Sequence, residues 1–210
     1  MRQLLLLTFV AISALLLPEL ALAHPDHSHS HALSSAQSSF FAGWAHPWTG
    51  ADHLLALCGV ALWSVQLGGS FRRLLPLTFV AAMGAGLFLG SQFGALPLVE
   101  GAIVLSLVVI GGLVMFEHKF SELLSIAIVA LFASMHGAAH GIELPLGANI
   151  LPFAVGALAA ASTILLLGNF FLGAIFSGRR SGVRIPISRA PLYSLRALGA
   201  AIALSPLLIA

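Results

Sequence analysis

The chain carries very little charge. Asp, Glu, Lys and Arg make up 8% of its 210 residues, whereas they account for roughly a quarter of a typical soluble domain. Hydrophobic residues make up 59% and the mean hydropathy is +1.04, which predicts an integral membrane protein. The nine Lys and Arg residues give a net charge of +2 but form no basic patch, so we expect no nucleic-acid partner.

Cysteine is nearly absent as well. The single Cys58 excludes an intrachain disulfide, and in an apolar helix it is expected to be a small buried side chain. The sequence also contains no nucleotide-binding motif and no polar stretch long enough for an appended soluble domain. Any function must therefore reside in the membrane bundle and its polar N-terminal segment. Composition leaves the oligomeric state open.

The first 23 residues have the pattern of a secretory signal peptide. Arg2 precedes an apolar stretch from Leu4 to Leu17, Pro18 interrupts it, and the run ALA ending at Ala23 is a small-x-small cleavage sequence. We expect cleavage after Ala23, with an uncleaved first transmembrane helix as the alternative. In both cases the segment that follows is exported.

Residues 24–39 are polar and rich in histidine, and they lack the apolar periodicity of a packed element. We expect a flexible extracytoplasmic arm in which several imidazoles reach one nickel, cobalt, copper or zinc ion. The alternative is a hydrophilic spacer. The histidines that would assist metal capture are His24, His27, His29 and His31.

Six apolar segments follow within residues 40–210, and each reaches or approaches the roughly 20 residues that cross a bilayer as a helix. The expected fold is an all-α, polytopic membrane bundle of six transmembrane helices. Trp44 and Trp48 near one end of the first segment and Trp63 near the other are expected to form interfacial aromatic belts. The segments are Phe41 to Leu67, Leu74 to Phe93, Leu96 to Phe116, Leu123 to Ile142, Ile150 to Phe176, and Pro191 to Ile209.

The basic residues of the loops predict the orientation in the inner (cytoplasmic) membrane. Alternate loops are basic, and the loops between them contain no Lys or Arg, so the basic loops are expected to be cytoplasmic. This places the mature N-terminus and the C-terminus outside. The loop residues are Arg72 and Arg73, then Lys119, then Arg179, Arg180, Arg184 and Arg189.

The fourth apolar segment ends in the run HGAAHGIE. Because residues three, four and seven apart share one face of a helix, His136, His140 and Glu143 are expected to form one column. Ionisable groups in a hydrocarbon environment cost several kcal/mol unless they are paired, hydrated or coordinated. Two imidazoles and a carboxylate on one face predict a metal site.

A second run, HPWTGADH, lies at the start of the first apolar segment. His46 and His53 are seven residues apart and are expected on one helical face, while Asp52 is expected either to bind metal or to orient an imidazole. The first segment enters from outside and the fourth runs outward, so both runs lie at the same extracytoplasmic depth. Their nitrogen and oxygen donors suit nickel(II), cobalt(II) or zinc(II).

The run HPWTGADHLLALCGVALW, followed about ninety residues later by HGAAHGIE, resembles the HupE/UreJ family of nickel and cobalt permeases, and the resemblance extends over the whole chain. It implies uptake of nickel(II) or cobalt(II) for hydrogenase, urease or cobalamin synthesis, with no prosthetic group. The positions matching the functional residues of the family are His46, Asp52, His53, His136, His140 and Glu143.

Two other classes of function fit parts of the pattern. A membrane-embedded zinc hydrolase acting on lipid amides would use two histidines and a carboxylate, with Asp52 or Glu143 as base. A metal sensor or storage protein would also bind the ion, but the chain has no soluble output domain. The expected partners are therefore a divalent metal ion and the lipid bilayer.

Overall fold

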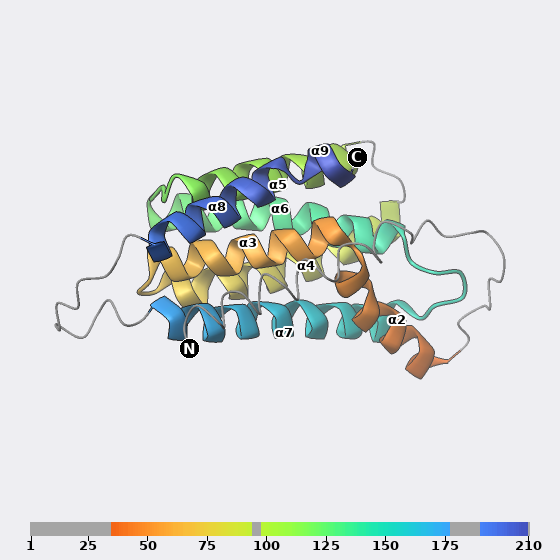
Figure 1. The fold of residues 1–210 in the computed structure, drawn as a ribbon. Coiled ribbons are helices and arrows are strands. Elements are labelled where there is room, and N and C mark those ends of the chain that lie inside the picture. Colours follow the sequence, from red (N-terminus) through yellow and green to blue (C-terminus); the bar gives the residue numbers. More distant parts are fainter. Residues whose placement is uncertain (1–34, 94–97, 177–189, 210) are drawn as a thin grey trace.

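The computed structural model describes residues 35–93, 98–176 and 190–209, and all regular structure in these ranges is helical. The long helices run roughly along one common direction and form an elongated bundle, and α2 is inclined to them at one end (Figure 1). They are α2 (Ala36–Thr49), α3 (Ala51–Leu67), α4 (Phe71–Phe93), α5 (Val99–Met115), α6 (Glu122–Ile142), α7 (Ile150–Phe176), α8 (Ala190–Leu204) and α9 (Pro206–Ile209).

The helices follow the six predicted apolar segments in order. By length and composition α4, α6 and α7 can each cross a membrane, and α2 with α3 makes a fourth candidate span that is broken by a 73° bend. The apolar helix α5 and the Ser194–Leu204 part of α8 are shorter. A multi-pass helical membrane protein is thus confirmed, while six spans remain a prediction. Residues 1–34, with the predicted signal peptide and most of the arm, lie outside the described residues.

The break between α2 and α3 corrects two expectations. Pro47 cannot donate a helical hydrogen bond, and Gly50 adopts an extended conformation with φ −82° and ψ 109°. Gly50 ends α2 through its N–H, which donates to the His46 carbonyl, and begins α3 by accepting from the Leu54 N–H. The first segment is therefore not one helix, and the expectation that His46 and His53 share a helical face is wrong (Figure 1).

The start of α2 also differs from the expected limit of the arm. The Ser35 side chain accepts a hydrogen bond from the Ser38 N–H at 3.0 Å and so caps the helix. The last residues of the predicted arm, up to Ser39, are helical, and the Ser39 hydroxyl accepts a hydrogen bond from the Asn149 N–H at the start of α7.

The outside of the bundle is apolar. Many large hydrophobic side chains are exposed, including Leu77, Phe88, Leu131, Leu151 and Phe170. Such a surface fits a lipid environment, because a soluble monomer rarely exposes large contiguous apolar patches.

Trp63 does not belong to an interfacial belt. Its side chain is fully buried, and its indole N–H donates to the His118 carbonyl at 3.0 Å. The expectation that Trp63 forms part of an interfacial belt is wrong because α3 lies inside the bundle and contacts α4, α5 and α7. Two arginines near the end of the bundle where α3 ends and α4 begins make polar contacts. Arg72 donates to the Asn169 carbonyl at 2.8 Å, and Arg196 pairs with Glu117 at 3.1 Å.

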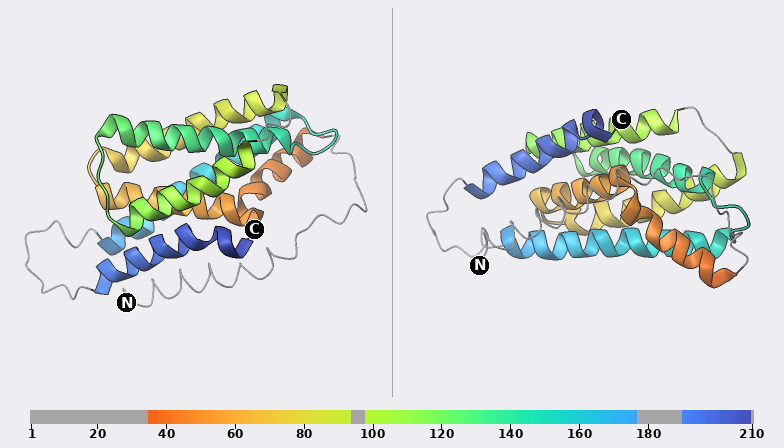
Figure 2. Two further views of the ribbon diagram at one scale, coloured as in Figure 1. Left: turned by 90° about the horizontal axis from the view of Figure 1, so that it is seen from above. Right: turned by 45° about the vertical axis from the view of Figure 1, so that its right-hand side comes forward.

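Glycines allow three pairs of helices to approach at backbone distance. A Cβ at Gly137 would collide with the Met83 carbonyl, so α6 packs directly on α4. In the same way Gly43 of α2 meets the Phe153 carbonyl of α7, and Gly111 of α5 meets α8, which runs beside it (Figure 2). These contacts fix the helices that carry the polar residues at the end of the bundle near the α2–α3 break.

Close packing at Gly137 can be tested by adding one methyl group. Gly137→Ala should lower the thermal midpoint of the detergent-solubilised protein, because overpacking costs about 1–3 kcal/mol. Gly112→Ala is the matched control: a Cβ at Gly112 has no neighbour within 4 Å, and alanine favours helix. Circular dichroism on heating measures both variants. Equal midpoints for the two variants would show that the α4–α6 contact does not require glycine.

Candidate metal site

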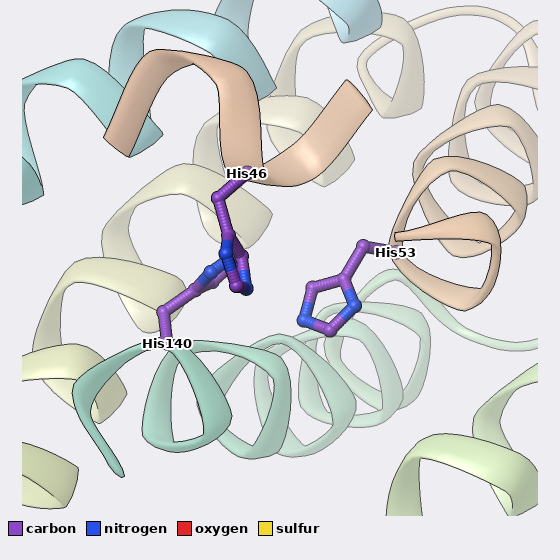
Figure 3. A group of neighbouring side chains, drawn as sticks. All are labelled: His46, His53 and His140. Carbon is purple, nitrogen blue, oxygen red and sulfur yellow. The ribbon is translucent and has the colours of Figure 1, made fainter. Parts of the chain in front are cut away.

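Both histidine runs lie at one end of the bundle. His46 is in the last turn of α2, Asp52 and His53 are in the first turn of α3, and His136 and His140 are in the last turns of α6. Figure 3 shows His46, His53 and His140 directed from three helices toward the same space. Residues almost ninety positions apart in the sequence are thus neighbours.

Three of the imidazoles form a compact group. One ligand nitrogen from each of His46, His53 and His140 lies within 4.8 Å of the others. The ring centroids are 4.6 Å apart for His46 and His140, 4.5 Å for His53 and His140, and 5.8 Å for His46 and His53. Nitrogens about 2.0–2.1 Å from one ion would lie roughly 3.0–3.4 Å apart. Small side-chain rotations are therefore enough to bring all three to a common metal.

The glycines of α6 explain why its histidines face the other two helices. Each of Gly137 and Gly141 follows a histidine by one residue, and each meets the backbone of α4. Because successive residues on a helix are rotated by about 100°, the preceding His136 and His140 are directed to one side of the contact with the α4 backbone. The packing contact and the ligand face are therefore specified by the same six-residue run.

His53 and His136 each make a hydrogen bond through Nδ1 of the kind that orients a metal-binding imidazole. The His53 Nδ1 lies 2.8 Å from the Asp52 Oδ1, which also accepts the His53 backbone N–H at 2.8 Å. The His136 Nδ1 donates to the Phe132 carbonyl at 3.0 Å. With Nδ1 protonated in the neutral ring, Nε2 keeps a free lone pair. Metal-binding histidines in proteins usually show this arrangement.

The free nitrogens are buried and unsatisfied. Among the described residues, the Nε2 atoms of His53 and His136 and both nitrogens of His140 have no hydrogen-bond partner. His136 is 1% exposed and His140 is fully buried. Buried polar atoms without partners are rare and costly, so this concentration calls for a bound species. The donor set suits a borderline divalent metal.

The carboxylates of Asp52 and Glu143 lie at the more exposed, outer edge of the histidine cluster, which we call the rim. Glu143 is the C-cap of α6, which ends at Ile142, and its N–H donates to the Ala139 carbonyl. Its side chain is 56% exposed and lies 3.1 Å from the His46 Nε2, while the Asp52 side chain is 34% exposed. Neither carboxylate belongs to the compact group of three imidazoles. The predicted auxiliary histidines of the arm lie outside the described residues.

Gly50 is a functional candidate that the sequence analysis missed. A Cβ there would lie 3.1 Å from the Asp52 Oδ1 and 3.1 Å from the His53 Nδ1. Glycine therefore leaves space for the Asp52–His53 pair at the helix break. A signal was present in the sequence, because Gly50 follows Pro47 by three residues and glycine is common just after the last residue of a helix.

The fold and the site define a polytopic helical membrane protein with a cluster of side chains near one end of the bundle that could hold a metal ion. The chain belongs to the HupE/UreJ family: the family model described as HupE / UreJ protein matches residues 12–209. The chain is also 40% identical over 148 residues to the protein named Protein HupE of Rhizobium leguminosarum bv. viciae. That alignment covers 70% of this chain and 77% of the relative. No solved structure matches the chain.

Family membership confirms the resemblance seen in the sequence. The family is one of nickel and cobalt transport rather than of enzymes, so the zinc hydrolase considered above is not favoured.

The space at Gly50 generates a prediction. Gly50→Ala should weaken binding of nickel(II) to the purified protein by about tenfold or more, because loss of an orienting interaction typically has this effect. Isothermal titration calorimetry measures the affinity. The Gly112→Ala protein should bind as the wild type does. Unchanged affinity in Gly50→Ala would mean that the Asp52–His53 pair does not depend on this space.

Proposed function

We propose that the protein carries nickel(II) or cobalt(II) from outside the cell across the inner membrane, through a site built on the broken first span and α6. The observation that carries the proposal is the group of three imidazoles from three helices, with buried nitrogens that have no other partner among the described residues. The donor set suits both metals.

The charges at the two ends of the bundle support this direction. Arg72 and Arg73 lie in the first turn of α4, at the end opposite the histidines, and basic loops favour the cytoplasmic side. The histidine cluster then faces outside, with both termini of the mature chain. The histidine-rich arm on the same side would raise the local concentration of metal.

Metal capture begins at the two carboxylates of the rim. Glu143 and Asp52 attract a hydrated divalent cation to the rim, where His46, with a side chain 27% exposed, is the first imidazole within reach. Nitrogen ligands from His53 and His140 then replace water of the ion, which lowers the cost of moving its charge into the bilayer. The buried side chains of Phe79, Trp63 and Phe132 close the core beyond the site, so release inward requires helix movement.

The membrane potential is a sufficient driving force. One charge gains about 2.3 kcal/mol per 100 mV, so a divalent cation gains about 4.6 kcal/mol (2 × 2.3) when it moves to a negative interior. Facilitated diffusion therefore needs no coupled hydrolysis of nucleotide.

Uptake of radioactive nickel and cobalt into cells tests the proposal. His53→Ala and His140→Ala should each reduce the initial rate at low external metal by about tenfold or more, because each removes a ligand whose loss leaves other buried nitrogens unpaired. His118→Ala is the matched control, since this exposed histidine lies beside Phe120 at the opposite end of the bundle. Wild-type uptake in the His53 and His140 variants would contradict the proposed site.

A further inference from the structure

His136 is set apart from the other three histidines of the cluster. It is not a member of the compact group formed by His46, His53 and His140. It lies one helical turn before His140 on α6, which places it about 6 Å farther from the rim. Its ring is next to that of His53, with centroids 5.0 Å apart.

Exposure falls along the line from rim to interior. The His46 side chain is 27% exposed and that of His53 is 7% exposed, while His136 and His140 are buried. The ring of His140 contacts the rings of both His46 and His53. The rings of His53 and His140 therefore both lie next to His46, the most exposed imidazole. The ring of His53 also lies next to that of His136.

The nitrogens of His136 are prepared to receive a ligand. Its Nδ1 donates to the Phe132 carbonyl, so the lone pair of the neutral ring is on Nε2, which is buried and has no partner among the described residues. On its other side lies the ring of Phe79, 6.1 Å away, and then the apolar core. The Nε2 of His136 is thus the last unsatisfied imidazole nitrogen before that core.

We propose that His136 forms a second, inner station for the metal, together with His53 and His140. The ion moves inward when His46 is exchanged for His136 while His53 and His140 stay bound. Exchanging one ligand at a time avoids the desolvated, uncoordinated ion that would be costly in the core. His46 then governs capture, and His136 governs onward passage. This inference rests on the proposed transport of nickel(II) or cobalt(II).

Separate measurements of binding and transport test the two roles. His136→Asn and His136→Gln keep a donor for the Phe132 carbonyl, and His46→Asn and His46→Gln are the matched outer variants. Calorimetry gives the affinity and stoichiometry of nickel(II) for the full-length purified protein. Uptake into proteoliposomes under an inside-negative potential gives KM and the maximal rate, and thermal midpoints identify any variant that fails to fold.

We expect the His136 variants to bind nickel(II) within about threefold of the wild-type affinity and to lose about tenfold or more of the maximal rate. The His46 variants should show a KM raised by about tenfold or more and an affinity for nickel(II) weakened by about the same factor. If the His136 variants bind as weakly as the His46 variants, the four imidazoles form a single site and the inner station is refuted, while the transport proposal stands. A wild-type maximal rate in the folded His136 variants also refutes it. Absence of nickel(II) binding or uptake by the wild-type protein would instead refute the proposed function.

Discussion

The cost of burying imidazole nitrogens without hydrogen-bond partners is the constraint on which the arrangement of this bundle depends. His53, His136 and His140 are all buried, and each has at least one nitrogen with no partner in the described part of the chain. A protein interior tolerates such groups only where something else compensates them. In the proposed function a coordinated metal ion compensates them, and imidazole nitrogen suits such an ion.

The scaffold explains how these groups are held together in spite of that cost. Gly137 and Gly141 allow α6 to pack directly against the backbone of α4, and Gly43 allows α2 to pack against the backbone of α7. The histidines therefore lie on helices whose positions are fixed by contacts elsewhere on their surfaces. In the proposed transport, inward release would move α4 and α6 as one unit, because sliding them apart would lose their glycine contacts. The broken first span supplies the other side of the site, with His46 before the break and His53 after it.

Much of this site follows from the sequence, for identifiable reasons. The spacing of His136 and His140 places them on one helical face, and the alternation of basic loops places both histidine runs at the same depth. Local pattern could not give the 73° bend at Gly50, because the run from Phe41 to Leu67 is apolar enough for a continuous helix. His46 and His53 are adjacent because the helix breaks, and not because they share a face. Trp63 was misplaced for a related reason: which side of α3 is buried depends on tertiary packing.

The most direct test of the account is the position of the bound ion. Crystals of the full-length protein soaked in nickel(II) can be measured at the nickel absorption edge, where anomalous differences locate the metal. The account predicts a peak about 2.0–2.2 Å from imidazole nitrogens of His53 and His140, with His46 or His136 as a further ligand. Nickel bound only elsewhere, with the imidazoles of His53 and His140 free of metal, would contradict it.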